Sequence, residues 1–200
     1  MVENSVGDGR EISAEDLQRL RETLLDMFGG LRYDEVTIRE VCKRACVSPK
    51  TIYKYFGTKD QLIYSCIQPD MDELNQQLAK IGRKTSLDAS KKVVAIAKAW
   101  CDFYMARHRL ATVVFLRIPS AYWLSNPHFI QTAVIQANVQ VLKEGQKSGL
   151  VNKDVPADVL LDMMTGASHR MMARWLLLEP DNGSAIKRML IRGLTSMAAP

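Results

Sequence analysis

Residues 36–62 read VTIREVCKRACVSPKTIYKYFGTKDQL, and this stretch predicts two short helices joined by a tight turn. Thr37 can cap the first helix through its hydroxyl. Ser48 can cap the second, in which Pro49 takes the first position, where a missing N–H costs nothing. Gly57 then ends the second helix. One buried stripe along the first helix is expected from Ile38, Val41, Cys42 and Ala45.

The two helices, residues 37–44 and 48–56, are separated by about three residues, which is the spacing of a helix-turn-helix. In that motif the first helix braces the second, whose leading end faces base edges. Residues 36–59 also carry six Lys or Arg against one Glu, which is typical of a phosphate-facing patch or of an ordinary solvated helix face. We expect DNA contacts from Thr37, Arg39, Lys43, Ser48, Pro49, Lys50, Thr51, Tyr53, Lys54, Tyr55 and Lys59.

This segment resembles the tetracycline-repressor-like (TetR) family over about residues 13–67. The matching residues are Thr37, Ala45, Val47, Ser48, Tyr53, Tyr55, Phe56, Lys59, Asp60 and Leu62. The chain departs from the family pattern at Cys46, Cys42 and Ile52, where the family has Gly, Ala and Leu. The resemblance implies a helical DNA-binding head, a helical ligand-binding body and a homodimer that is formed by the last two helices and binds a palindromic operator.

The rest of the sequence also predicts an all-α protein of about nine helices, with a three-helix head and a C-terminal bundle for ligand binding and dimerisation. We expect a flexible arm at residues 1–12, the DNA-binding domain at 13–67 and the body at 68–200. Pro69 predicts a kink or break near residues 66–68. The body helices are expected at residues 86–108, 110–118, 126–148, 156–179 and 184–198.

Composition and motifs exclude several classes. No apolar run approaches the length of a membrane span and the N-terminus lacks the pattern of a signal peptide, so a cytoplasmic protein is expected. Neither a dinucleotide or phosphate-binding glycine loop nor a nucleophile or metalloprotease motif occurs, which predicts that the protein is not an enzyme and needs no cofactor or metal. Cys42 and Cys46, four residues apart, leave open a thiol sensor.

The body is rich in Met and aromatic residues, which form either ordinary core or an apolar ligand pocket. The candidate pocket residues are Trp100, Phe103, Tyr104, Phe115, Trp123, Met163, Arg170 and Trp175. The candidate dimer residues are Gly166, Ile186, Leu190, Leu194 and Met197, although packing within one chain would give the same pattern. We therefore expect a repressor that a largely apolar small molecule releases from DNA. The alternatives are a DNA-binding protein without such an effector, which would serve chromosome organisation or a protein partner, and a carrier of apolar molecules whose head no longer binds DNA.

Overall fold

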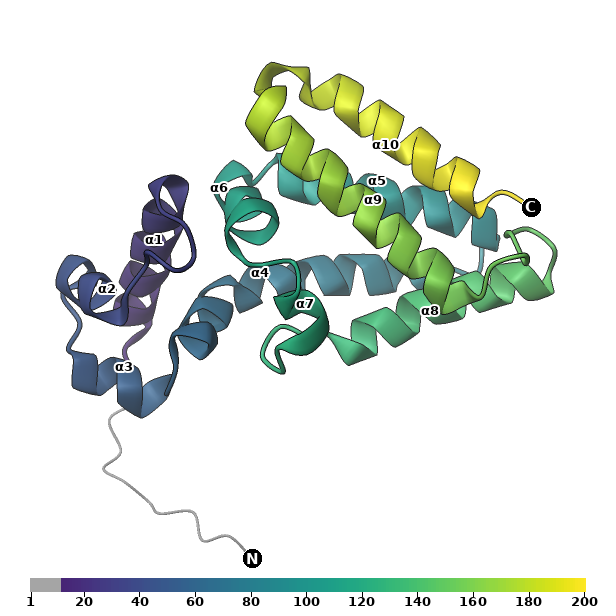
Figure 1. The fold of residues 1–200 in the computed structure, drawn as a ribbon. Helices are drawn as coiled ribbons and strands as arrows, with labels where there is room; N and C mark the ends of the chain where they lie inside the picture. The colour runs from purple at the N-terminus through teal and green to yellow at the C-terminus, as the bar shows by residue number, and fades with distance from the viewer. Residues whose placement is uncertain (1–11) are drawn as a thin grey trace, which may run out of the picture. The chain divides into compact units, whose positions relative to one another are not determined.

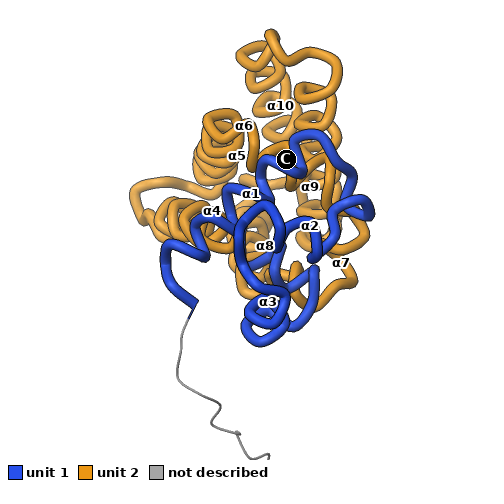
Figure 2. The backbone as a smooth tube through the Cα atoms, turned by 90° about the vertical axis from the view of Figure 1, so that its left-hand side faces the viewer, with its two compact units in different colours: residues 1–67 blue, residues 68–200 orange. Residues whose placement is uncertain are grey.

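The structure, a computed structural model, describes residues 12–200 and divides the chain into two compact units, which meet in sequence between Ile67 and Gln68 (Figure 2). Over the described residues every regular element is helical, which confirms the predicted all-α class (Figure 1). Residues 1–11, which make up nearly all of the expected arm, lie outside the described part. No helix of the described part is both long and apolar enough to cross a membrane.

Unit 1 contains three helices and the beginning of a fourth. They are α1 (Ala14–Gly30), α2 (Ile38–Ala45), α3 (Pro49–Tyr55) and the start of α4 (Lys59–Gly82). Ser13, Thr37 and Ser48 cap the first three, and each hydroxyl accepts a hydrogen bond from the backbone N–H three residues ahead. These helix starts depend only on neighbouring residues, which is why the sequence predicts them well.

Cys46 forms the turn between α2 and α3 in a left-handed conformation, with φ of 54°. Its N–H donates to the carbonyl of Cys42, which closes the end of α2. A glycine adopts this conformation without a steric cost, whereas a residue with a Cβ is strained there. The turn therefore keeps the geometry of a glycine-containing helix-turn-helix even though the glycine is missing.

The helix α4 continues through Pro69 without interruption, so the break that the sequence allows near residues 66–68 does not occur. Ile67 and Met71 are buried on either side of the proline, while Pro69 itself is exposed. Burial of these apolar neighbours offsets the backbone hydrogen bond that proline cannot make. The same helix thus begins in unit 1 and ends in unit 2.

Unit 2 is a helical bundle (Figure 1). After α4 its helices are α5 (Ala89–Met105), α6 (His108–Thr112), α7 (Tyr122–Ser125), α8 (Thr132–Lys147), α9 (Ala157–Leu178) and α10 (Gly183–Ala198). A π-helical turn, Val113–Arg117, follows α6, and a short 3₁₀ turn, Pro180–Asn182, precedes α10. The core forms where α5 packs against α8 and α10, and where α9 packs against both.

Two body helices differ from the sequence-based expectation. The helix expected at residues 110–118 is a short α-helix that widens into the π turn at Val113. The helix expected from residue 126 begins only at Thr132, because the N–H of His128 donates to the Asn126 side chain in a local turn. Such side chain to backbone hydrogen bonds compete with helix formation.

Candidate DNA-binding helix and ligand cavity

The helix α3 buries one side and exposes the other. Ile52 is fully buried, whereas Lys50, Lys54 and Tyr53 are exposed, the last with 57% of its surface accessible. The hydroxyls of Ser48 and Thr51 lie 2.8 Å apart at the leading end of the helix. A short helix that is anchored on one side and polar on the other can present its N-terminal end to a DNA groove.

Most of the expected DNA-contacting residues are accessible. The exposed ones are Thr37, Arg39, Lys43, Ser48, Pro49, Lys50, Tyr53 and Lys54, and the partly buried ones are Thr51, Tyr55 and Lys59. Arg39 and Lys43 are one turn apart on α2, where both can reach phosphate oxygens. The ammonium of Lys54 lies 5.3 Å from the centre of the Tyr55 ring, which restricts that lysine to one side of α3.

Lys59 is held inside unit 1 by the loop before α2. Its ammonium donates to the carbonyls of Tyr33 (2.8 Å) and Val36 (3.2 Å) and lies 4.5 Å from the centre of the Tyr33 ring. Burial lowers the pKa of Lys59, although Asp60 and Asp34 act in the opposite direction. Two of its three donors are thus directed at protein carbonyls, and its geometry favours bracing the loop over binding phosphate.

Lys59→Met is expected to lower the free energy of unfolding by about 2 kcal/mol, because it removes charge-assisted hydrogen bonds and leaves the two carbonyls unpaired. Chemical denaturation monitored by circular dichroism measures this change. Lys43→Met, at an exposed position on α2, is the matched control and should alter stability by less than about 0.5 kcal/mol. Equal, small changes in both variants would show that Lys59 does not brace the loop.

Tyr33 is an organising residue that the sequence does not reveal. It is buried, its ring stacks on Phe28 with centroids 6.0 Å apart, and its hydroxyl donates to the Asp60 carboxylate. Together with Lys59 it fixes the loop between α1 and α2 to the start of α4. The sequence gives no signal for this cluster because Phe28 and Tyr33 lie more than twenty residues before Lys59 and Asp60.

The four cysteines are free, and only Cys46 is exposed. Burial raises the pKa of the Cys42 thiol, raises that of Cys66 to about 12 and raises that of Cys101 to about 11. A thiol reacts as its thiolate, so these three should be inert at neutral pH. No cluster of three or more potential metal-binding side chains occurs in residues 12–200.

Treatment of the native protein with a maleimide at neutral pH is therefore expected to give one adduct, at Cys46, as read by mass spectrometry of the intact protein and its peptides. The unfolded protein should take up four, because denaturation exposes the three buried thiols. A Cys46→Ser variant should give no rapid adduct while it is folded. Rapid modification of Cys42 in the native protein would contradict the burial described here.

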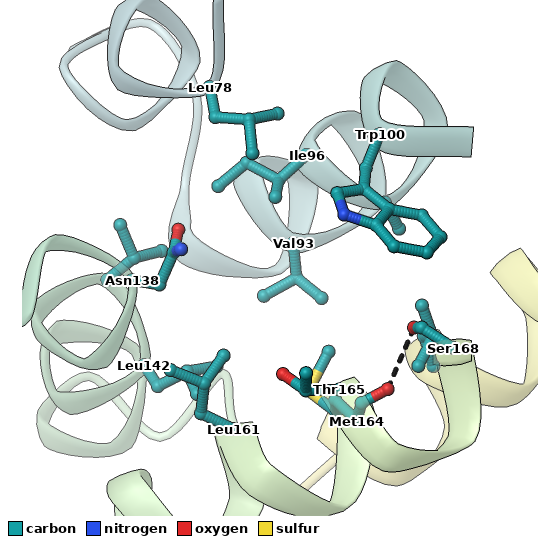
Figure 3. A pocket seen from close by; sticks show the side chains of 13 residues that line it. Leu78, Val93, Ile96, Trp100, Asn138, Leu142, Leu161, Met164, Thr165 and Ser168 are labelled. Atoms are coloured by element: carbon teal, nitrogen blue, oxygen red, sulfur yellow. Dashed lines mark hydrogen bonds between the residues drawn. The ribbon is translucent and has the colours of Figure 1, made fainter. Parts of the chain in front are cut away.

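Unit 2 contains an apolar cavity of about 140 Å³ between α5, α8 and α9, which is partly open to solvent (Figure 3). Val93 and Trp100 of α5 face Leu161 and Met164 of α9 across it. The complete lining is Leu78, Val93, Ile96, Ala97, Trp100, Asn138, Val141, Leu142, Leu161, Met164, Thr165, Ser168 and Leu194. The Ser168 hydroxyl already donates to the carbonyl of Met164, at 2.8 Å, so the wall there is effectively apolar.

Of the pocket residues expected from the sequence, Trp100 lines this cavity. Phe103, Tyr104 and Phe115 are buried beside it, and the Trp100 ring centre lies 4.9 Å from Tyr104 and 5.4 Å from Phe115. The other four lie elsewhere: Trp175 is buried and donates to the carbonyl of Pro180, Trp123 packs on Phe129, and Met163 and Arg170 are exposed. The aliphatic lining cannot be predicted from the sequence, because Leu, Val and Ile residues that line a cavity have the same spacing as other core residues.

His169 lies next to this aromatic group. Its ring centre is 5.3 Å from that of Phe115, its Nε2 is buried without a hydrogen bond to any described residue, and burial lowers its pKa below the ordinary 6.5. The neutral form is therefore the one that the folded body favours. The stability that this gives is present above pH 6.5 and is lost as the pH falls toward the lower pKa of the folded state.

His169→Phe is expected to reduce the loss of unfolding free energy between pH 7 and pH 5, since a phenyl ring retains the contact with Phe115 without a proton to gain. Denaturant titrations at several pH values measure this. His128→Phe, the same substitution at another partly buried histidine of unit 2, is the matched control. An unchanged pH dependence in His169→Phe would remove His169 as its source.

The C-terminal end of α5 is pinned to α4 within unit 2. Arg107 donates to both carboxylate oxygens of Glu73 at 2.8 Å, lies 3.7 Å from the buried Asp70 carboxylate and stacks over Phe103 at 3.9 Å. The Tyr104 hydroxyl lies 3.5 Å from the Met71 sulfur. The helix that carries Trp100 is thus tied to the part of α4 that follows Pro69.

Three of the expected dimer residues are core residues of the protomer. Ile186, Leu190 and Leu194 are buried, and the last two pack on Ala97 and Cys101 of α5. Met197 is partly buried against the same core, whereas Gly166 is exposed on α9 with no atom near the position of an added Cβ. The exposed apolar residues of the last two helices are Val159, Met163, Leu177, Leu178 and Met189.

Comparisons with known proteins agree with this geometry. Residues 28–66 match the family model described as bacterial regulatory proteins, tetR family. No curated protein sequence matches the chain. The fold is similar to that of the fatty acid degradation regulator FadR from Bacillus halodurans, at 16% identity and a TM-score of 0.71, over 92% of this chain and 98% of that one.

Two further solved structures are similar. FadR from Bacillus subtilis, in complex with stearoyl-CoA, has 17% identity and a TM-score of 0.69, over 88% of this chain and 98% of that one. The regulatory protein TetR from Rhodobacter sphaeroides has 21% identity and a TM-score of 0.58, over 88% and 96%. All three of these similar structures are those of regulators. The protein thus has the helix-turn-helix segment and the fold of the tetR family of bacterial regulatory proteins.

Proposed function

We propose that the protein is a sequence-specific transcriptional repressor that binds a palindromic operator as a homodimer and is released by a largely apolar small molecule. The observation that carries this proposal is the exposed polar face of α3, which is braced by α2 in a segment that matches the family model. The apolar cavity in the other unit supports the effector. Each part has its own support and its own test.

DNA binding is supported by the chemistry of the leading end of α3. The major groove of DNA admits an α-helix, and lysine can donate to guanine O6 and N7 there. Lys50 occupies the second position of α3 and is exposed, so it is the best candidate for a base contact. Arg39, Lys43 and Tyr53 are placed to contact phosphates, which fix the orientation of a protein on the duplex.

The proposal of an effector is supported by the cavity and by the hydrogen bonds and ion pairs that connect the end of α5 to α4. A ligand shifts an equilibrium only if it binds one conformation more tightly than the other. A molecule that enlarges the cavity would displace Trp100 and α5, and Arg107 would carry that displacement to α4. Since α4 begins in unit 1, a change in α4 is a direct route to the DNA-binding unit. The complex of the Bacillus subtilis FadR with stearoyl-CoA agrees with a ligand that has a long apolar part.

A homodimer is supported by an exposed apolar stripe on α9. Val159, Met163 and Gly166 follow at intervals of four and three residues, so they lie on one face of the helix. Met189 of α10 is also exposed. We propose this surface as the dimer interface in place of the buried face of α10. A two-fold dimer would place two recognition helices about 34–36 Å apart, on successive major grooves.

The thiol sensor is the weaker alternative. It needs two accessible, reactive thiols, whereas Cys42 is buried and has a raised pKa. A DNA-binding protein without an effector remains the main rival, and it predicts that no apolar compound stabilises the body. A carrier of apolar molecules predicts instead that duplex DNA does not bind.

Selection of bound duplexes from a random pool tests the proposal. Enrichment of a palindrome with half-sites about ten base pairs apart would support DNA binding and a two-fold dimer together, and sedimentation velocity should then show a dimer. Enrichment of no sequence would overturn the regulator. Once an operator is known, fluorescence anisotropy of the labelled duplex can follow its release by apolar compounds, and the absence of release by any of them would favour the rival without an effector.

A further inference from the structure

A second hollow lies beside the apolar cavity, between α4 and α8, and like the cavity it is partly open to solvent. Its volume is about 650 Å³, and seven of its fifteen lining residues have polar side chains, whereas the cavity has only Asn138, Thr165 and Ser168. The lining is Asp72, Asn75, Gln76, Leu78, Ala79, Gly82, Arg83, Ile96, Ala133, Val134, Ala137, Asn138, Gln140, Val141 and Glu144. We call this hollow the α4–α8 groove.

The groove and the cavity adjoin. They share four lining residues, which form a wall common to both: Leu78, Ile96, Asn138 and Val141. Asn138 is the only one of the four that can form hydrogen bonds through its side chain. Figure 3 shows its amide at the side of the cavity opposite Trp100 and Ser168. An apolar compartment adjoins a groove that also carries amide and charged side chains, and such a pair of sites suits the two ends of an amphiphile.

The charges of the groove restrict the polar end of such a ligand. Its charged lining consists of the carboxylates Asp72 and Glu144 and the guanidinium of Arg83, so negative charge exceeds positive by one. Arg83 Nε already donates to the carbonyl of Ala79, and Glu144 accepts from Gln140. Two carboxylates in a hollow repel a phosphate or carboxylate group, and one guanidinium does not neutralise a polyanion.

The remaining polar lining is made of amides, which suit an uncharged partner. Asn75, Gln76, Gln140 and Asn138 each offer a carbonyl oxygen and an NH₂ group. Asn75 already donates to Gln131, so its carbonyl oxygen remains the group it can offer. Hydroxyl, ester and amide groups form neutral hydrogen bonds with such side chains, and a site built for them rejects analogues that lack them.

We propose that the effector is an uncharged amphiphile, whose apolar chain enters and enlarges the cavity and whose hydroxyl, ester or amide head lies in the α4–α8 groove. Asn138 is the specificity-determining residue, because it bonds the first polar group beyond the chain. This inference rests on the proposed function, since it names the chemical class of the effector of the same body. It also explains how the ligand would act on α4, which forms one wall of the groove.

Matched ligands with one decanoyl or decyl chain test the proposal. They are monodecanoylglycerol (neutral), decanoate (one negative charge), decanoyl-CoA (polyanionic) and decyltrimethylammonium (one positive charge). Isothermal titration calorimetry measures binding below the critical micelle concentration, and anisotropy of labelled operator measures release. Monodecanoylglycerol is expected to bind at least about tenfold more tightly than each of the others and to release DNA at the lowest concentration.

Two sets of variants make the roles separable. Asn138→Leu should weaken the binding of monodecanoylglycerol about tenfold, the effect of one lost hydrogen bond, and leave the binding of decyltrimethylammonium unchanged, because its head can neither donate nor accept a hydrogen bond. Asn138→Ser keeps a hydrogen-bond donor and acceptor, so it should weaken the binding of monodecanoylglycerol less than Asn138→Leu does. It also controls for a folding defect in the leucine variant. Asp72→Asn combined with Glu144→Gln should strengthen decanoyl-CoA and leave the neutral ligand nearly unchanged.

The outcomes distinguish this inference from the proposed function. Equal binding and release by all four ligands would overturn the selectivity while the effector-controlled repressor stands. Tightest binding by decanoyl-CoA, decanoate or the cation would overturn the uncharged head. An equal loss of affinity for all four ligands in Asn138→Leu would show that Asn138 has only a structural role. No binding by any ligand, with intact operator binding, would overturn both this inference and the effector.

Discussion

A protein in which Lys50 and Lys54 are both replaced by alanine is expected to bind its operator at least about 100-fold more weakly at 0.15 M salt. Both side chains are exposed on α3, and a dimer carries each twice, so four cations leave the DNA interface. Each lost phosphate contact lowers the slope of log affinity against log salt by about 0.9, so the slope should fall by as much as about 3.6. Where a lysine contacts a base instead, its replacement should reduce the discrimination against a wrong base pair by about 1–3 kcal/mol.

Fluorescence anisotropy over a range of salt concentrations measures both quantities. The single variants separate them: loss of a base contact relaxes the preference at one base pair, whereas loss of a phosphate contact weakens all sequences alike. Lys153→Ala, an exposed lysine of unit 2, is the matched control and should leave affinity and slope nearly unchanged. If the double variant retains the affinity and slope of the parent, α3 does not enter the groove.

The DNA-binding unit could be predicted from the sequence because its signals are local. The caps at Thr37 and Ser48 and the burial of Ile52 each depend on neighbours within one or two turns. Lys59 shows where such reasoning stops. The sequence predicts a DNA contact from Lys59, but its ammonium donates to the carbonyls of residues 33 and 36, which only the tertiary structure brings close.

The body could be predicted only in outline, because an apolar stripe on a helix does not indicate which element packs against it. Ile186, Leu190 and Leu194 form a narrow stripe that suits a second copy, yet in the structure Leu190 and Leu194 pack on α5. The cavity is hidden for the same reason, since its aliphatic lining has the periodicity of ordinary core. Of the aromatic and Met residues expected in a pocket, only Trp100 lines the cavity; Phe103, Tyr104 and Phe115 lie beside it and the rest lie elsewhere.

Gly145 is the clearest case of a residue whose importance only packing reveals. It lies within α8, where glycine ordinarily costs about 1 kcal/mol relative to alanine. A Cβ added there would lie 2.3 Å from Val151 Cγ2 and 2.9 Å from Ala89 Cβ. Both neighbours belong to one core cluster or pack against it, and Val151 is 1% exposed, so neither can withdraw into solvent. The helix therefore carries an unfavourable residue so that α5 and the segment after α8 can approach it.

Replacing a glycine within a helix by alanine ordinarily stabilises the protein. Gly145→Ala is instead expected to lower the free energy of unfolding by about 3 kcal/mol and Tm by about 6–12 °C. Thermal unfolding followed by circular dichroism measures it. Gly29→Ala, in α1 with no atom within 4 Å of the added Cβ, is the matched control and should be neutral or stabilising.

Val151→Ala provides the second control for Gly145. It removes the nearest atom, Cγ2, so the loss caused by Gly145→Ala should be smaller in the Val151→Ala background than in the parent, by at least about 1 kcal/mol. Additive losses would mean that Val151 is not the obstacle, and a stabilised Gly145→Ala protein would mean that α5 and α8 are farther apart than described. Because α5 and α8 both line the cavity, Gly145 also sets the spacing of two of its walls.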